Sequence, residues 1–420
     1  MTFLQTRRAQ IVLLILLCVL AYGRSLTLPL LEDDYPNITG ARTWGTPAGF
    51  HTLLHTGLIV LRATGYWLTA AVWSLVGFQP IVFRLTSLAL HVLNTLLVFG
   101  FCRSLFHYAS NLRPAAFWAA AFFAIQEGHQ EAVMWVSANN ELLMFLFGVA
   151  SLWCWVVAIE RGWRYRMASM LLFALALLSK ESAVIFLPLL LLVTPSIKRR
   201  RSLAWITPFA LLTLAAVAIV ISTRVYSFRF TDGSFSLHSP FYLTWPRSFA
   251  RILWVWGWLA LAWMILRKKM LYWPALIWIG VALIPYSFLT YSTAIPSRQT
   301  YLASFGLALL VGYALADFAQ FANYPKTSLA LVVSAMLIHN IGYLWIKKQA
   351  QFAERAAPTE QLLSLVRRTK GPVKIQCFPQ PPIVADEAVR VALGRNPEET
   401  LSYDDLSKLK PVAVFCYQKR

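Results

Sequence analysis

The chain has 420 residues, of which 58% are hydrophobic and 13% are charged. A soluble domain carries about 25% charged residues, so this composition excludes an ordinary soluble protein and indicates a multi-pass helical protein surrounded by membrane lipids. The formal net charge of +20 could indicate a nucleic-acid partner. Much of this charge lies in short loops between apolar runs, where membrane topology and anionic lipid headgroups explain it. No nucleic-acid partner is therefore predicted.

The first apolar run covers residues 11–31 and follows Arg7 and Arg8. Because no convincing small-residue cleavage site follows, we interpret it as an uncleaved first helix with a cytoplasmic amino end. It delivers the acidic stretch Glu32–Asp34 to the extracytoplasmic side. Residues 32–79 then form the first extracytoplasmic loop, whose semi-polar, tryptophan-containing sequence predicts amphipathic helices in the membrane interface.

Further apolar segments predict an all-α polytopic membrane protein with about eleven transmembrane helices. They lie at residues 80–102, 114–126, 139–159, 166–179, 182–197, 203–222, 249–266, 270–290, 300–318 and 327–346. Several are short for a hydrocarbon core of about 30 Å, so we expect their boundaries to shift by several residues.

The tail, residues 347–420, is richer in Pro, Glu and Lys than the preceding residues 1–346. It predicts a small extracytoplasmic α+β C-terminal domain packed on the transmembrane domain. Strands are expected at residues 373–378 and 411–417, and a helix at 386–393. Its two cysteines, Cys377 and Cys416, can pair if the compartment is oxidising.

The distribution of charge predicts which face of the membrane carries a site. Loops assigned to the cytoplasm are basic, as at Lys198–Arg201 and Arg267–Lys269, and contain only the acids Glu160 and Asp317. Acidic residues gather instead on the extracytoplasmic face, which indicates an active site there. The chain is thus expected in a bacterial inner membrane or the endoplasmic reticulum membrane, with its amino end inside and its carboxyl end outside.

Two polar segments on the extracytoplasmic face are candidates for this site. Glu127 and Glu131 are four residues apart and share one face if helical, while His129 points elsewhere. Lys180-Glu181 separates two long apolar runs. It is either a turn with a local ion pair or a lysine placed over a lipid-linked phosphate.

A third candidate is Arg298, in the segment Ser297–Tyr301 that begins the tenth span. It is either a snorkelling anchor or part of an anion site. Phosphate-binding glycine loops, GxSxG nucleophile elbows and HExxH metal motifs are absent from the sequence.

These segments resemble the GT-C superfamily of integral-membrane glycosyltransferases, and within it the protein O-mannosyltransferase branch that includes the transmembrane-and-TPR proteins. That branch has an acidic pair in its first extracytoplasmic loop, matched by Asp33-Asp34, and a Lys-Glu turn, matched by Lys180-Glu181. Its His-Pro-x-His-x-Glu-Ala-Val-x-Trp segment is matched from Gln126 to Trp135, with Gln126 and Glu127 replacing the first His and the Pro. Its Arg-x-x-Tyr-Leu-x-Ser pattern is matched from Arg298 to Ser304, whereas the TPR repeats are absent.

The resemblance implies inverting transfer of a sugar from a polyprenyl- or dolichyl-phosphate donor to a hydroxyl of a protein, glycan or lipid acceptor. It implies an aspartate general base, Asp34 in preference to Asp33, and donor-phosphate binding by Arg298 and Lys180. The residues expected to orient substrates are His129, Glu131, Glu181 and Tyr301. A divalent cation, Mg²⁺ or Mn²⁺, could bridge Asp33 and Asp34 to the phosphate, but the sequence does not require one.

Two other functions are compatible with a polytopic chain. A lipid or sugar transporter should have polar residues near span centres and often a duplicated half, whereas here the acids are one-sided and no internal repeat is visible. A non-enzymatic scaffold would depend on the tail rather than on Asp34 or Arg298. The sugar and the acceptor are left open by the sequence.

Overall fold

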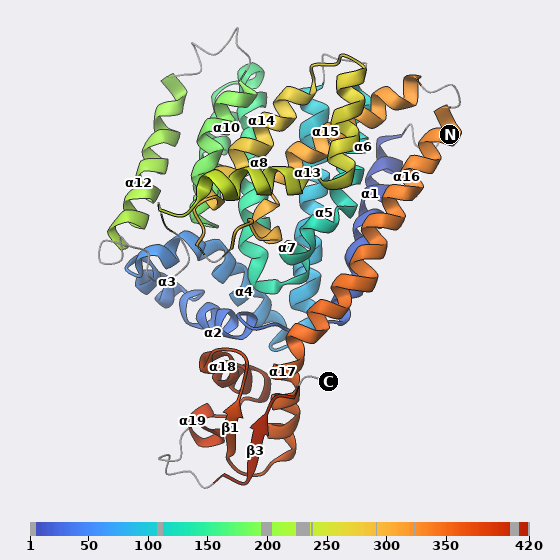
Figure 1. The fold of residues 1–420 in the computed structure, drawn as a ribbon. Helices are drawn as coiled ribbons and strands as arrows, with labels where there is room; N and C mark the ends of the chain where they lie inside the picture. The colour runs from blue at the N-terminus through green and yellow to red at the C-terminus, as the bar shows by residue number, and fades with distance from the viewer. Residues whose placement is uncertain are drawn as a thin grey trace.

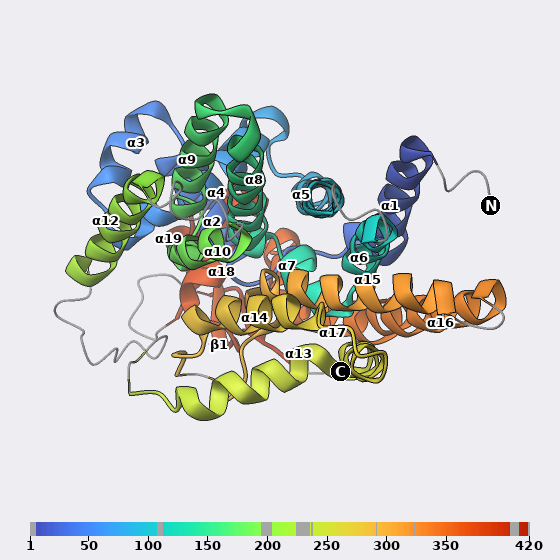
Figure 2. The ribbon, with the colours of Figure 1, turned by 90° about the horizontal axis from the view of Figure 1, so that it is seen from above.

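The computed structural model describes residues 6–106, 112–194, 204–223, 236, 238–290, 292–321, 325–403 and 411–418. A bundle of helices stands above a small domain that contains a β-sheet, and α2, α3 and α4 form a layer between them (Figure 1). The long helix that ends in α17 runs along one side of the bundle and continues into the small domain (Figures 1 and 2). The basic loop Lys198–Arg201 lies outside the described residues.

The helices of the bundle are α1 (Arg7–Tyr22), α5 (Pro80–Leu105), α6 (Arg113–Ile125), α7 (Gln130–Met134), α8 (Asn139–Arg161), α9 (Trp163–Leu177), α10 (Phe186–Val193), α12 (Thr207–Thr223), α13 (Phe241–Leu266), α14 (Tyr272–Leu283), α15 (Ala303–Phe321) and α16 (Pro325–Gly342). The layer consists of α2 (Asp34–Trp44), α3 (Pro47–Leu54) and α4 (Ala63–Val76). Short 3-10 turns connect them at η2 (Gly23–Thr27), η3 (Gly57–Arg62), η5 (Glu127–His129), η6 (Val136–Ala138), η7 (Glu181–Ile185), η9 (Ala204–Ile206), η11 (Ile284–Tyr286) and η12 (Ser297–Thr300).

Seven helical segments among the described residues are long and apolar enough to cross a membrane. They are Arg7–Thr27, Ile59–Val76, Pro80–Leu105, Val136–Arg161, Phe241–Leu266, Ala303–Phe321 and Lys326–Arg368. Four shorter apolar helices accompany them, at Arg113–Ile125, Glu181–Val193, Thr207–Ser222 and Tyr272–Tyr286. A polytopic helical membrane protein is therefore confirmed, and within the described residues seven helices have spanning length where about eleven were expected.

The shortness of the other helices has identifiable causes in the chain. The span expected at residues 270–290 is interrupted because Pro285 removes a backbone donor, and α14 gives way to the turn η11. The span expected at 166–179 is α9, whose first turn carries Arg164 and Arg166. The segment Ile59–Val76 qualifies by length, although its residues were expected in the interface.

α15 forms the centre of the bundle. Every residue from Ala303 to Ala316 is buried, as expected for a helix that is apolar all round. Gly312 allows the close approach of α6, because a Cβ at this position would lie 2.7 Å from the backbone oxygen of Ala115. Small residues at such a crossing are typical of helix packing in membranes. The position of α15 matters for function because the Arg298 segment directly precedes it.

α8 and α9 form an antiparallel pair linked by Gly162 alone. Its φ of +90° is readily adopted only by glycine. Ser151 and Ser169 join the two helices reciprocally: each hydroxyl donates to the other residue's backbone oxygen, at 2.7 and 2.8 Å. The hairpin therefore brings the first turn of α8 and the residues after α9 to the same end of the bundle.

The small domain contains a three-stranded parallel sheet in the order β2-β1-β3. Its strands are β1 (Val373–Cys377), β2 (Leu401–Ser402) and β3 (Ala413–Cys416), and its helices are α17 (Gln349–Arg368), α18 (Pro382–Leu393) and α19 (Pro397–Thr400). Val373 of β1 pairs with Leu401 of β2 and with Ala413 of β3. The strands and the helix expected in the tail are thus present, and a disulfide between Cys377 and Cys416 joins β1 to β3.

The expected domain boundary at residue 346 falls inside a continuous helical segment. α16 passes into a π-helical turn, η13 (Tyr343–Lys348), and then into α17. The division into residues 1–346 and 347–420 therefore stays a prediction.

Candidate active site

The acidic stretch forms a tight turn between α1 and α2. The backbone N–H of Asp34 donates to the Leu31 oxygen at 2.6 Å, and the Asp34 carboxylate accepts from the Leu31 N–H at 2.8 Å. Glu32, inside this turn, has a φ of +27°, which is unusual for a residue with a side chain. The turn gives the three adjacent carboxylates three different environments.

Asp34 is 1% exposed and holds the first loop against the second. Its Oδ1 accepts from the backbone N–H of Ser137 at 2.7 Å and from the Ser137 hydroxyl at 2.6 Å. Buried Arg84 is the neighbouring cation, and it donates to the Leu28 oxygen at 2.6 Å. Burial raises the pKa of Asp34, while Arg84 and the bonds from Ser137 oppose this rise.

Asp33, in contrast, is exposed and lines a cavity of about 540 Å³. The cavity lies between the first loop, the start of α8, the Lys180-Glu181 turn and the segment before α15. Its charged lining residues are Asp33, Arg62, Glu141, Lys180, Glu181 and Arg298. Partial desolvation and the neighbouring Glu32 raise the pKa of the Asp33 carboxyl, against the effect of nearby arginines.

Lys180 meets Glu141 because the α8–α9 hairpin returns the chain to the same end. The Lys180 Nζ donates to Glu141 Oε1, and the hydroxyl of Tyr286 donates to Glu141 Oε2 at 2.9 Å. Lys180 also lies 5.3 Å from the centre of the Tyr286 ring. This wall of the cavity is therefore a nearly buried ion pair capped by a tyrosine.

Three more charged residues of the lining, Arg62, Glu181 and Arg298, also have ionic partners. Arg62 Nη2 lies 3.2 Å from Glu181 Oε1. The backbone N–H of Arg298 donates to Glu131 Oε2 at 3.2 Å, and its guanidinium Nη1 lies 4.0 Å from the same oxygen. The guanidinium carbon of Arg298 also lies 4.7 Å from the centre of the Trp135 ring. Arg298 is thus held at the cavity wall by the second loop.

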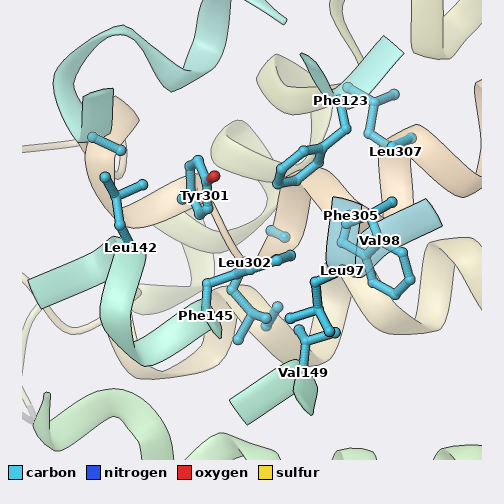
Figure 3. Packing of buried hydrophobic residues seen from close by; sticks show 14 of the residues in the cluster. Leu97, Val98, Phe123, Leu142, Phe145, Val149, Tyr301, Leu302, Phe305 and Leu307 are labelled. Carbon is cyan, nitrogen blue, oxygen red and sulfur yellow. The ribbon is translucent and has the colours of Figure 1, made fainter. Parts of the chain in front are cut away.

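His129 and Tyr301 are fully buried behind the cavity instead of lining it. His129 Nε2 lies 2.6 Å from the Ser304 hydroxyl, and Tyr301 contacts His91 through a 2.8 Å hydrogen bond. The Tyr301 side chain lies among aromatic rings that include Phe123 (Figure 3). Burial lowers the pKa of His129, which favours the neutral form of its ring. These residues tie the second loop to the segment that carries Arg298.

The structure therefore brings Asp33, Lys180, Glu181 and Arg298 together around one cavity. Glu131 reaches it indirectly, through Arg298, and lines a second cavity of about 810 Å³ on the other side of that arginine. Asp34 lines only a separate void of about 20 Å³. Four of the eight residues singled out in the sequence thus face the same space.

Glu141 was expected from the sequence to extend the polar patch of the second loop, and it lines this cavity. Sequence reasoning assigned no role to Arg62 and Tyr286, which also line it. Arg62 stands in an interfacial segment where a charge looks like a surface residue. Tyr286 lies in an apolar run, and nothing in its neighbourhood distinguishes it.

Two of the three carboxylates of the acidic stretch are engaged by protein groups. Both Asp34 oxygens accept protein hydrogen bonds, and both Glu32 oxygens pair with Arg355. Among the described residues, no group of three or more His, Cys, Asp or Glu side chains is placed to hold a metal ion. Mg²⁺ is usually held by one or two carboxylates together with waters and substrate phosphates, so the ion considered from the sequence, which would bridge Asp33 and Asp34 to the phosphate, stays a prediction.

Residues 63–226 match the family described as dolichyl-phosphate-mannose-protein mannosyltransferase. The matched segment contains the second loop and the Lys180-Glu181 turn. A search of curated proteins found no match to the chain.

Solved structures of two membrane proteins are similar in fold. The oligosaccharyltransferase of Archaeoglobus fulgidus, with a tethered acceptor peptide, gives a TM-score of 0.55 at 12% identity and covers 90% of this chain and 62% of its own. The archaeal oligosaccharyltransferase AglB from Archaeoglobus fulgidus, in complex with an inhibitory peptide and a dolichol-phosphate, gives a TM-score of 0.52 at 12% identity and covers 93% of this chain and 64% of that one. ArnT from Cupriavidus metallidurans, in the apo state, gives 0.50 at 14% identity, covering 93% of this chain and 88% of that one.

The family match covers residues 63–226 and the fold is similar to those of AglB and ArnT, and both findings agree with the resemblance found in the sequence. The family of its matched segment is named for mannosyl transfer from dolichyl phosphate. The chain spans less than two thirds of the length of the archaeal oligosaccharyltransferase.

Proposed function

We propose that the chain transfers a sugar from a polyprenyl- or dolichyl-phosphate donor to an acceptor hydroxyl on the extracytoplasmic face. One observation carries the proposal: the exposed carboxylate of Asp33 and the guanidinium of Arg298 line the same cavity of about 540 Å³. A carboxylate base and a cation for a leaving phosphate are the two groups that this reaction needs.

In the proposed reaction Asp33 accepts the proton of the acceptor hydroxyl. The acceptor oxygen forms a bond to the anomeric carbon while the bond from that carbon to the phosphate oxygen breaks. The electron pair leaves with the lipid phosphate, whose charge Arg298 offsets. Attack opposite the leaving group inverts the anomeric configuration, as in single-displacement glycosyl transfer.

We assign the base to Asp33 rather than to Asp34, which the sequence favoured. Asp34 is buried, and its two oxygens already accept bonds from Leu31 and Ser137. Taking up a proton there would weaken these bonds and remove the electrostatic attraction to Arg84. Asp33 is exposed to the cavity, and its raised pKa strengthens it as a base.

Lys180 serves as a second contact for the donor phosphate. Its ammonium group has three N–H donors, and the bond to Glu141 uses one of them. Glu181, paired with Arg62 at the same wall, orients the sugar. Glu131, His129 and Tyr301 act indirectly, because they hold the segment that carries Arg298.

The known relatives support a lipid-linked donor. The matched family is named for dolichyl-phosphate-mannose, and a structure of similar fold contains a dolichol-phosphate. Another structure of that archaeal protein contains Zn and sulfate, but we route no step of the reaction through a metal. The acceptor is a protein, glycan or lipid hydroxyl.

Purified protein incubated with a panel of labelled polyprenyl-phosphate sugars and membrane acceptors tests the proposal. We expect transfer of at least one sugar, and its loss on Arg298→Ala. A transporter would move a lipid or sugar across vesicles without forming a glycosidic product, and a scaffold would do neither. Absence of a glycosylated product with every donor, from folded protein, would overturn the transferase assignment.

A further inference from the structure

The C-terminal domain contacts the acidic stretch through a two-point ion pair. Arg355 of α17 donates from Nε to Glu32 Oε1 at 3.3 Å and from Nη2 to Glu32 Oε2 at 3.0 Å. Paired contacts between a guanidinium and a carboxylate fix orientation as well as distance. Glu32 is the residue directly before Asp33.

The backbone of Glu32 needs such a contact. Its φ of +27° lies outside the regions that residues with a side chain normally occupy, and such conformations persist only where surrounding structure holds them. The Leu31–Asp34 hydrogen bonds close the turn from within. Arg355 holds the Glu32 side chain from outside the turn.

Arg355 also reaches the second loop. Its guanidinium carbon lies 4.6 Å from the centre of the Trp135 ring, and that of Arg298 lies 4.7 Å from the same ring. Trp135 lines the cavity and contacts both arginines. Arg355 is thus linked to Glu32 on one side and, through Trp135, to the arginine that binds phosphate in the proposed reaction.

The C-terminal domain fixes Arg355 in turn. The Gln380 side chain donates to the Arg355 backbone oxygen at 3.3 Å. Tyr35 and Ile38 of α2 share one buried apolar cluster with Leu362 of α17 and Val373 of β1. The domain and the first loop therefore pack as one unit around the ion pair.

We propose that Arg355 is a positioning residue for the reaction: through the Glu32 pair and the Trp135 contact it holds Asp33 at the cavity, which makes the C-terminal domain part of the active site. This inference rests on the proposed function. It assigns to the tail a role in the chemistry that neither the family match, which ends at residue 226, nor the cavity lining reveals.

Arg355 also acts on Asp33 electrostatically. The charged groups around Asp33 are Glu32, which raises the pKa of its carboxyl, and Arg298, Arg355 and Arg62, which lower it. Removal of Arg355 leaves two of these three cations. The pKa of Asp33 then rises, and the acidic limb of the rate profile moves to higher pH.

The test compares Arg355→Ala with Thr39→Val. Thr39 donates to Glu387 at 2.6 Å, so its substitution removes another polar contact between α2 and the C-terminal domain, away from Asp33. For Arg355→Ala we expect kcat to fall at least about tenfold with an almost unchanged KM for donor and an acidic limb at higher pH. The Thr39→Val variant should keep the kcat and pH profile of the wild type.

A charge exchange, Glu32→Arg with Arg355→Glu, should recover part of the kcat that Arg355→Ala loses. Such recovery would not occur if Arg355→Ala lost activity only because less of it folds.

Hydrogen exchange at the Asp34 amide gives a readout that needs no activity. We expect faster exchange there in Arg355→Ala, with unchanged exchange in β1. If Arg355→Ala has the same kcat, the same pH profile and the same hydrogen exchange at Asp34 as the wild type, the positioning role of Arg355 is overturned. If the wild-type protein transfers no sugar but the Asp34 amide still exchanges faster in Arg355→Ala, the transferase function is rejected. The ion-pair contact between Arg355 and Glu32 then still stands.

Discussion

Asp34 and Ser137 are joined by two hydrogen bonds, one from the backbone N–H of Ser137 at 2.7 Å and one from its hydroxyl at 2.6 Å, both to Oδ1 of Asp34. Asp33, one residue earlier, lines the cavity instead. The two adjacent carboxylates therefore have different roles. Asp34 holds the first loop against the second by hydrogen bonds, and Asp33 faces the cavity in which the substrates are proposed to bind.

The first prediction concerns stability at Asp34. In Asp34→Asn an amide group faces the Leu31 N–H or a Ser137 donor, and buried Arg84 loses its neighbouring charge. An unsatisfied buried polar group costs about 1–3 kcal/mol, so we expect a clear loss of thermal stability. Asp33→Asn should unfold at the wild-type temperature. Equal melting temperatures in detergent for the two variants would contradict the fastening role of Asp34.

The second prediction concerns pH. The pKa of Asp33 is raised by desolvation and by Glu32, above the value of about 3.9 for a solvated aspartate. Since the base must be ionised, kcat/KM should fall as pH drops through this raised value and should level off above it. The pH dependence of kcat/KM measures this directly. A rate that stays constant down to about pH 4 would exclude Asp33 as the base.

The third prediction concerns the buried pair of Lys180 and Glu141. Removing one member of a buried ion pair leaves an uncompensated charge and costs about 3–5 kcal/mol. Lys180→Met should therefore destabilise the protein strongly, whereas Lys180→Met combined with Glu141→Gln should recover much of the stability. Thermal inactivation of the two variants measures this difference. A double variant as unstable as the single one would show that the two side chains are not energetically coupled.

The fourth prediction concerns the α6–α15 crossing. A Cβ in Gly312→Ala would lie 2.7 Å from the backbone oxygen of Ala115, which cannot rotate away, so the helices must separate. We expect a loss of thermal stability of about 1–3 kcal/mol from this overpacking. Gly342→Ala is the matched control, because nothing lies within 4 Å of its Cβ. The prediction is wrong if the two variants melt alike.

The sequence predicted which residues lie at one end of the bundle better than it predicted their detailed contacts. Hydrophobic runs and loop charges placed Asp33, Lys180, Glu181 and Arg298 on one face, and these four line one cavity. Among the described residues seven helices, not about eleven, have spanning length, because apolar composition does not reveal where a helix ends early, as α14 does before Pro285. The strands and the helix of the tail were found because short apolar runs separated by turn residues mark them.

The distinction between Asp33 and Asp34 was beyond sequence reasoning. It depends on the Glu32 backbone and on Ser137, which lies more than 100 residues away in the chain. His129 and Tyr301 were expected to orient substrates because they belong to motifs, yet they are buried among aromatic rings. A motif identifies residues that belong together, whereas tertiary packing decides which of them faces the substrate.

The most direct test of the account is the rate of sugar transfer by Asp33→Asn from a labelled polyprenyl-phosphate sugar, with donor binding measured on the same protein. The account predicts a fall of roughly 10²–10⁴ in kcat, typical for loss of a general base, with donor binding retained. Transfer at close to the wild-type rate by folded Asp33→Asn would contradict it.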